Sequence, residues 1–376
     1  MKERGDLRNQ LRAVRLRLRM SQQELADAAG VARQTIGGME AELYSPSATV
    51  AIKLARALGC TVEELFWLES DRETLAAFAA ESVPPDAEVR VSLARVGDRW
   101  IAHSLEGDQA FRMEMAPADA VGIRQGGSEV MTVGLVDDVK ELARTVVVAG
   151  CSPVLSLWAR SAERWFPGLR VHWISANSTD SLRKLACGEV HAAGVHLMDV
   201  VTGEFNAPFV RRELSEKPAV LVSLGMWEEG LMVQRGNPGS LRSACDLARR
   251  GVRFINREKG SGSRILLDSL LDAAGTDRDA ISGYSDEGIT HRDVARRVAL
   301  NGADAAIGTA SVAAAYQLDF VPLARVRYDL ALLKQYLDDD PVRQLLSTLQ
   351  HRWVRQQLTL LGGYDMTLSG EITRLD

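Results

Sequence analysis

The stretch FINREKGSGSRILL, residues 254–267, combines three features that together predict an anion-binding turn. Phe254 and Ile255 end an apolar run typical of a strand, and the leucines after Ile265 begin a helix. The glycines and serines at 260–263 let backbone N–H groups approach a ligand, and the helix N-terminus favours negative charge. The same pattern is also typical of a simple tight turn with a serine N-cap, so the neighbouring segments decide between the two.

Strands and helices alternate before this stretch and predict a parallel sheet. Ligands of parallel sheets bind beyond the carboxyl ends of the strands, and hydroxyl-bearing loops follow the first two strands here. The Gly260 turn follows a later strand at the same edge, so three polar loops converge and favour a ligand site. The expected strands are residues 146–149, 171–174 and 191–196, and the expected helices are 153–166 and 180–187.

A second α/β lobe is expected over about residues 230–318, with a helix at 240–249 and a return to the first lobe at 320–323. Two lobes joined by such crossings resemble the type II periplasmic-binding-protein fold, in the cytoplasmic variant found on regulators and molybdenum-cofactor proteins. The resemblance covers about 145–335 and implies a ligand held between the lobes, with molybdate or tungstate as first candidate. It rests on VVVAGCSPVLSLWAR, HLMDVVTGEFNAPFVRR, RFINREKGSGSRILLD, GYSDEGITH and DFVPLARVRYDL.

A tetrahedral dianion in such a cleft needs several short hydrogen-bond donors from both lobes and few full positive charges. Arg264 has two equal interpretations, because it can reach the anion or pair with Asp268 one turn along its helix. By position, the expected ligand-binding residues are Ser152, Ser178, Thr179, Ser261, Gly262, Ser263, Arg264, Thr290 and Tyr328.

Other titratable residues near these loops favour a different ligand. Carboxylates repel dianions, so these residues either hold the lobes together or bind a larger, partly cationic ligand. His196 and His291 are possible as a metal pair, but satisfied structural histidines are favoured, so no metal site and no cofactor are predicted. These residues are His196, Asp199, Glu204, Tyr284, Asp286, Glu287 and His291.

Residues 1–68 carry the signals of five short helices. An amphipathic helix decorated with arginines is expected over 7–18, and SQQE at 21–24 forms a capping box. Gly30 and Gly59 suit helix ends, and TVEE at 61–64 opens the last helix.

SQQELADAAGVARQTI, followed by YSP and LARALGCTVEELF, resembles the lambda-repressor-like (Xre-type) helix-turn-helix domain. The resemblance implies double-stranded operator DNA as partner and a homodimer, because one such domain makes few contacts. Gly37 and Gly38 depart from the longer polar side chains usual in the family, so the base readout stays open. The residues that the resemblance places against DNA are Gln22, Arg33, Gln34 and Thr35.

Three further segments complete the predicted organisation. Residues 69–86 are expected to be a helical linker that ends before Pro84-Pro85, and 87–144 a small β-rich connector. Residues 336–376 are expected to be a helical segment that packs on the first lobe or pairs with a second subunit. The sequence thus predicts a multidomain protein with an all-α helix-turn-helix domain, a β-rich connector and a two-lobed α/β periplasmic-binding-protein-like domain.

Composition sets limits on function. The 376 residues have a net charge of -5, which gives no general attraction to nucleic acid or membranes. A charged N-terminus and the lack of an apolar run of about eighteen residues predict a cytoplasmic protein without a membrane partner. Four scattered cysteines predict reduced thiols rather than a zinc or disulfide framework.

The predicted function is ligand-responsive, sequence-specific transcription regulation by sensing a small molecule. Catalysis is not expected, because neither a nucleophile elbow nor a phosphate-loop lysine is present. Two alternatives stay open: a C-terminal domain that is a non-responsive protein-interaction module, and a sensor of a larger organic metabolite.

Overall fold

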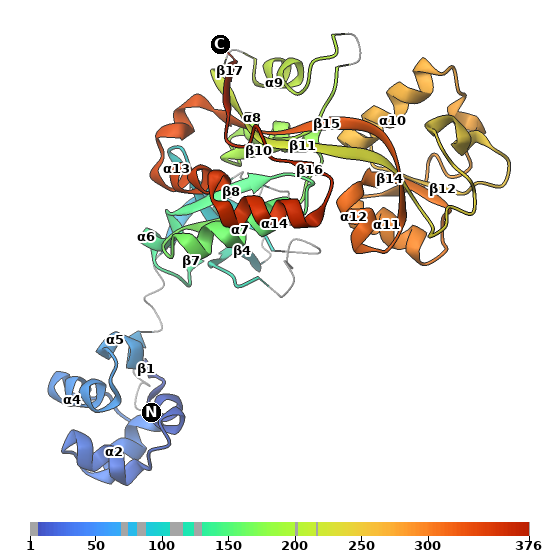
Figure 1. The fold of residues 1–376 in the computed structure, drawn as a ribbon. Helices are drawn as coiled ribbons and strands as arrows, with labels where there is room; N and C mark the ends of the chain where they lie inside the picture. Colours follow the sequence, from blue (N-terminus) through green and yellow to red (C-terminus); the bar gives the residue numbers. More distant parts are fainter. Residues whose placement is uncertain are drawn as a thin grey trace. The chain divides into compact units, whose positions relative to one another are not determined.

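The computed structural model describes residues 7–68, 74–80, 88–105, 116–123, 130–199, 202–215 and 217–375. The chain forms two compact units, Met1–Leu75 and Ala76–Asp376, each with its own hydrophobic core (Figure 1). Among the described residues, no helix combines the length and apolar character that a membrane span requires.

The first unit is a bundle of five short helices around a core that includes Leu25, Ile36 and Leu54. Both predicted capping boxes are present, and Gly30 and Gly59 adopt the left-handed conformation that ends a helix. The five helices are α1 (Leu11–Arg17), α2 (Gln22–Ala29), α3 (Arg33–Glu40), α4 (Ala48–Leu58) and α5 (Val62–Leu65).

The expected first helix over 7–18 was too long at both ends. Residues Leu7–Asn9 form strand β1, which pairs antiparallel with β2 (Phe66–Leu68). Leu18 lies beyond α1 and its side chain is 44% exposed, so it does not contribute to the core. The pairing of β1 with β2 joins the two ends of the domain, which helical periodicity within one segment does not reveal.

The second unit begins with a closed five-stranded barrel of order β3-β5-β4-β6-β7. The prediction of a helical linker over 69–86 is wrong for Thr74–Ala79, because these residues form β3 and pair with β5; residues 69–73 and 81–86 lie outside the described range. The connector expected over 87–144 is rich in strands where the structure describes it, and residues 106–115 and 124–129 lie outside that range. The remaining barrel strands are β4 (Glu88–Val96), β5 (Arg99–Ser104), β6 (Ala120–Ile123) and β7 (Val130–Leu135), and α6 (Val139–Leu142) follows them.

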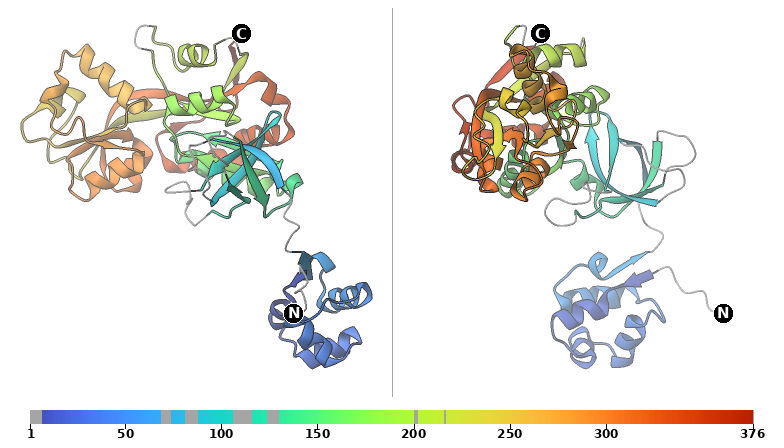
Figure 2. Two further views of the ribbon diagram at one scale, coloured as in Figure 1. Left: turned by 180° about the vertical axis from the view of Figure 1, so that it is seen from behind. Right: turned by 90° about the vertical axis from the view of Figure 1, so that its right-hand side faces the viewer.

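The rest of the second unit is two α/β lobes built on one ten-stranded sheet. Two fifteen-residue strands, β11 (Ala219–Val233) and β15 (Asp319–Leu333), pair antiparallel and run through both lobes (Figures 1 and 2). The predicted helix at 240–249 is wrong, since only a short 3-10 turn forms there, at Ala244–Ala248.

Each lobe adds its own strands and helices to these two crossings. The first lobe has β8 (Thr145–Ala149), β9 (Arg170–Ile174) and β10 (Ala192–Val195) with α7 (Val154–Trp165), α8 (Ser178–Cys187) and α9 (Ala207–Leu214). The second lobe has β12 (Phe254–Arg257), β13 (Glu287–Gly288) and β14 (Ala305–Thr309) with α10 (Gly262–Ala273), α11 (His291–Ala299) and α12 (Ala310–Ala315).

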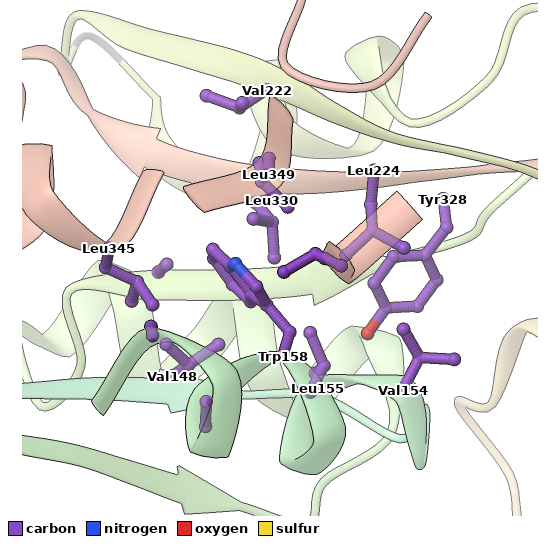
Figure 3. Packing of buried hydrophobic residues seen from close by; sticks show 14 of the residues in the cluster. Val148, Val154, Leu155, Trp158, Val222, Leu224, Tyr328, Leu330, Leu345 and Leu349 are labelled. Atoms are coloured by element: carbon purple, nitrogen blue, oxygen red, sulfur yellow. The ribbon is translucent and has the colours of Figure 1, made fainter. Parts of the chain in front are cut away.

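The C-terminal segment packs on the first lobe rather than standing apart. Helices α13 (Asp340–Ser347) and α14 (Arg352–Leu361) bury leucines beside Trp158, whose Nε1 donates to Thr348 Oγ1 at 2.8 Å (Figure 3). The prediction of helix throughout this segment is wrong for its last part. Strands β16 (Tyr364–Asp365) and β17 (Ile372–Leu375) pair with β11 and cover its free edge.

Candidate functional site

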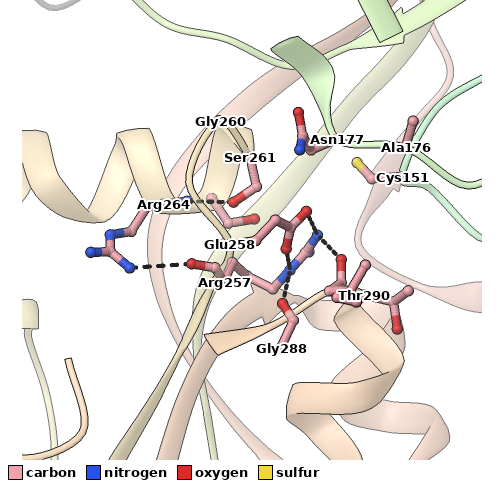
Figure 4. Close-up of polar contacts among 12 residues, drawn as sticks. Cys151, Ala176, Asn177, Arg257, Glu258, Gly260, Ser261, Arg264, Gly288 and Thr290 are labelled. Carbon is pink, nitrogen blue, oxygen red and sulfur yellow. Dashed lines mark hydrogen bonds and ion pairs between the residues drawn. The ribbon is translucent and has the colours of Figure 1, made fainter. Parts of the chain in front are cut away.

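The Gly260 turn lies where the two lobes touch. Thr179, at the start of α8 in the first lobe, donates its hydroxyl to the carbonyl oxygen of Gly260 at 3.0 Å, and its backbone N–H does so at 3.3 Å. Ser261 caps α10 by accepting a hydrogen bond from the N–H of Arg264 (Figure 4). The turn is therefore both a helix cap and a contact between the lobes.

Four of the predicted serines are fully buried near this contact. Ser152, Ser178, Ser261 and Ser263 are each at most 1% exposed. Ser178 Oγ accepts a hydrogen bond from the backbone N–H of His196 and lies 3.3 Å from its Nδ1. Ser263 donates to Glu229 Oε1 at 3.0 Å. The serines from both lobes thus meet around two residues that did not belong to the predicted binding set.

Gly262 explains why the lobes approach so closely. A Cβ atom at this position would lie 2.2 Å from the backbone oxygen of His196 and 2.5 Å from its ring. Only a residue without a side chain fits at this distance. The start of α10 therefore packs directly on the end of β10.

Three other predicted residues each have a structural role. Arg264 lies over the ring of Tyr284 and contacts Asp268 at 3.2 Å, so its side chain is bound within the second lobe. Thr290 is half-buried and caps α11. Tyr328 lies on β15 in the hydrophobic core, where burial raises its pKa well above the ordinary value (Figure 3). Its ring stacks on that of His196 with the centroids 5.7 Å apart, and among the described residues its buried hydroxyl has no hydrogen-bond partner.

A buried polar cluster occupies the junction of the lobes. Cys151 follows β8, His196 follows β10, Glu229 lies on β11 and His291 begins α11. Cys151 Sγ lies 3.6 Å from His196 Nδ1, and Glu229 Oε1 lies 3.1 Å from His196 Nε2. Among the described residues, both ring nitrogens of His291, Nε2 of His196 and Oε2 of Glu229 have no hydrogen-bond partner.

The two histidines have opposite electrostatic environments. Burial alone would lower the pKa of His196, but Cys151 and Glu229 more than offset this and raise it to about 10. Burial, together with Arg257 and His196, lowers the pKa of His291 well below its ordinary value. The expectation of two satisfied structural histidines therefore fails for His291, which is buried, neutral and without a partner in the described structure.

Sequence reasoning missed Cys151 and Glu229. Cys151 was expected to be an ordinary reduced thiol, and Glu229 lies inside a strand without a neighbouring motif. The only available signal was position, because Cys151 is adjacent to the predicted Ser152 after the first strand of the sheet.

A cavity of about 430 Å³ opens beside the cluster. Residues from both lobes line it, including Cys151 and Asn177 of the first lobe and Glu258 of the second (Figure 4). Ile289 of the second lobe also lines it. A larger cavity of about 790 Å³ lies between the barrel and the first lobe, and none of the predicted ligand-binding residues line it.

The predicted DNA-contacting residues lie at the starts of α2 and α3. Arg33 and Gln34 are exposed, whereas Thr35 and Gln22 are half-buried. Gln22 donates its side-chain amide to Glu40 Oε2 at 2.8 Å.

Arg15 is an exception to the prediction that arginines decorate the outer face of the first helix. It is buried and contacts Glu40 at 2.6 Å. Burial would raise the pKa of Glu40, but hydrogen bonds from Arg15 and Gln22 hold it below the ordinary value. Arg15 is therefore structural, and the exposed arginines of this region within the described range are Arg12, Arg17 and Arg19.

The unusual Gly37-Gly38 pair has a packing explanation at its second position. A Cβ on Gly38 would lie 2.4 Å from the ring of Tyr44, whose hydroxyl donates to the carbonyl of Thr35 at 3.0 Å. Gly37 has open space, with only ordinary contact to Gln22. Gly38 therefore makes room for an aromatic residue that supports α3.

Comparison with known families agrees with this architecture. Residues 159–350 match the PBP superfamily domain, and residues 11–65 match a helix-turn-helix family. This chain belongs to the PBP superfamily domain family. Its PBP-like region is preceded by a helix-turn-helix domain, as the sequence predicted.

Two relatives cover different parts of this chain. It is 35% identical over 195 residues to the uncharacterized protein YvgK of Bacillus subtilis (strain 168), which covers 52% of this chain and 63% of that protein. The chain thus spans less than two thirds of that relative. It is also 35% identical over 65 residues to the uncharacterized HTH-type transcriptional regulator YgzD of the same organism, covering 17% of this chain and 98% of YgzD.

Solved structures with similar folds include binding proteins and effector domains. A putative phosphate transporter substrate-binding protein from Clostridium perfringens, with bound phosphate, has a TM-score of 0.45 and 11% identity over 58% of this chain and 98% of its own. The CcmR regulatory domain of Synechocystis PCC6803, in complex with 2-PG, has a TM-score of 0.43 and 14% identity over 55% of this chain and 95% of its own.

Proposed function

We propose that this protein is a sequence-specific transcription regulator whose binding to operator DNA changes when a small molecule occupies the cleft between its two lobes. One observation carries the proposal: polar residues from both lobes are buried together where α8 and α10 begin, although ion pairs and hydrogen bonds do not satisfy all of them. A buried polar group without a partner is costly, so a ligand that supplies the partner favours the closed lobes.

An oxyanion such as molybdate or tungstate is the first candidate effector. Buried serine hydroxyls and the N-termini of two helices of ten and twelve residues support an anion. Glu229 opposes it, but the charged His196 beside this carboxylate neutralises the pair. Binding rather than catalysis is the proposed activity.

A thermal-shift screen of the full chain against molybdate, tungstate, sulfate, phosphate and small organic acids tests this proposal. An effector at 100 times its Kd raises the free energy of unfolding by about 2.7 kcal/mol. Replacing Ser261 and Ser263 with alanine is expected to remove the shift. A flat response across the whole panel would contradict sensing and favour a protein-interaction module.

The DNA-binding half is tested separately, by selecting an operator from random duplexes and measuring its affinity. Arg33→Ala and Gln34→Ala are each expected to weaken operator binding by about 1–3 kcal/mol if the side chain reads a base. Arg183→Ala, an exposed arginine of the other unit, is the control. Full operator affinity in both α3 variants would remove this helix from the interface. A homodimer is expected to protect two half-sites about one helical turn apart.

A further inference from the structure

We propose that the junction of the lobes binds a divalent metal ion that prefers sulfur ligands, such as Zn²⁺. Its ligands are Cys151, His196 and His291. Their side chains are buried, and one ligand atom from each lies within 4.8 Å of the others. This metal ion is a different ligand from the oxyanion effector. The site itself does not depend on the proposed function, and only the role of the ion in closing the lobes rests on it.

The distance between the ligand atoms of Cys151 and His196 fits a tetrahedral ion. Zinc bonds to sulfur at about 2.3 Å and to imidazole nitrogen at about 2.0–2.1 Å, so a tetrahedral site places these two atoms about 3.6 Å apart. Cys151 Sγ and His196 Nδ1 are separated by 3.6 Å. Ser178 Oγ also faces this nitrogen, at 3.3 Å, and is the contact that an ion would replace.

The surroundings of His196 resemble the outer shell of a metal site. When one imidazole nitrogen binds a metal, the other usually donates its proton to a carboxylate that fixes the ring. His196 Nε2 lies 3.1 Å from Glu229 Oε1, and Ser263 holds that oxygen at 3.0 Å. The ring is therefore oriented with Nδ1 toward Cys151.

His291 supplies an independent observation. It is 1% exposed, and neither of its ring nitrogens has a hydrogen-bond partner among the described residues. A buried imidazole in this state is costly unless a further group binds it. A metal ion satisfies it, and thiolate with imidazoles is the ligand set that zinc prefers over the alkaline-earth ions.

The charges also favour a cation. A metal ion that binds Nδ1 displaces the proton that this nitrogen carries in the charged, metal-free His196, so the bound ring is neutral. A divalent ion, a Cys151 thiolate and the Glu229 carboxylate then sum to zero, so these groups leave no uncompensated charge. The ligands come from both lobes, since Cys151 and His196 follow strands of the first lobe and His291 begins a helix of the second. Binding one ion therefore joins the lobes, which makes the ion a means of holding them closed.

Metal content and cobalt spectroscopy of the full chain test the site. After treatment with a chelator, the protein is expected to take up one Zn²⁺ per chain, and Co²⁺ is expected to give tetrahedral ligand-field bands and a thiolate charge-transfer band. Cys151→Ser is expected to abolish the charge-transfer band. His291→Gln removes a direct ligand and is expected to weaken zinc binding by more than the 10- to 100-fold that is typical for loss of an outer-shell partner. Cys245→Ser and His351→Gln are matched controls outside the cluster.

Failure of this inference can be told apart from failure of the proposed function. The absence of stoichiometric zinc, or equal zinc affinity in wild type and both cluster variants, overturns the metal site. The cobalt spectrum of the wild type decides the question if a variant does not fold. If molybdate raises the melting temperature of the metal-free chain but the chain takes up no zinc, the proposed function is supported and the metal site is overturned. Operator binding with and without Zn²⁺ then tests the role in closure.

Discussion

Adding one methyl group at Gly262 is expected to force the lobes apart. The new Cβ would lie 2.2 Å from the backbone oxygen of His196, about 1.2 Å short of ordinary van der Waals contact. The obstacle is backbone rather than a flexible side chain, so it cannot turn away. Gly262 has no positive φ, so alanine fits the start of α10 without backbone strain. The whole effect therefore falls on the contact between lobes.

The expected magnitude follows from the cost of overpacking. Inserting a methylene into a packed interior typically costs about 1–3 kcal/mol. Because only the closed arrangement bears this cost, effector affinity is expected to fall by about 5- to 150-fold while each lobe stays folded. Circular dichroism of the Gly262→Ala variant is expected to match that of the wild type.

The chain provides its own positions for measuring closure. Cys187 of the first lobe and Cys245 of the second are exposed, whereas Cys151 is buried. Spin labels on the exposed pair, with Cys60 replaced by serine, report the distance between lobes by pulsed electron resonance. The Gly262→Ala distribution is expected to shift to a longer distance or to broaden. Gly37→Ala adds the same methyl group in the other unit, where it has space, and is the control.

An unchanged distance distribution together with unchanged effector affinity in Gly262→Ala would refute this reasoning. It would mean that the contact of α10 with His196 does not set the closed arrangement.

Four further predictions concern the rest of the chain. Arg15→Met leaves Glu40 buried without its partner and is expected to destabilise the first unit by about 3 kcal/mol, measured by hydrogen exchange of its helices. The lowered pKa of Glu40 contributes stability that is present above pH 4.5 and is lost as the pH falls through that pKa; exchange measured from about pH 6 to 3 should show this loss, and Glu40→Gln should reduce it. Gly38→Ala displaces Tyr44 and is expected to cost about 1–3 kcal/mol, with recovery in a double variant carrying Tyr44→Ala. Truncation after Gly363 removes β16 and β17, exposes the edge of β11 and is expected to cause aggregation, detected by light scattering.

Local signals in the sequence predicted the capped ends of helices α2, α4 and α5 in the first unit. A capping box depends on residues three positions apart, and Gly30 ends a helix by its own backbone preference. The strand and helix alternation of the first lobe was likewise visible, because apolar runs and polar loops follow each other directly. These features need no information from distant residues.

Pairing between distant segments was not predictable in the same way. Residues 74–79 have apolar positions compatible with a helix, yet they complete the barrel as β3 beside β5. The last strand, β17, pairs with Ala219–Val222 of β11, although helices α13 and α14 lie between these two strands in the sequence. A strand is stable only with a partner, and the partner's place follows from the whole fold.

The candidate site also has some features that local sequence predicts and others that depend on contacts between distant segments. The sequence by itself placed Ser152 and Ser178 in loops at one edge of the first lobe, because β8 and β9 are parallel neighbours that are each followed by a helix. Only the tertiary structure decided what lies at the centre. Cys151, His196, Glu229 and His291 come from four separate elements, and closure of the two lobes buries them together. No spacing along the chain encodes that contact, since the long strands β11 and β15 set how the lobes meet.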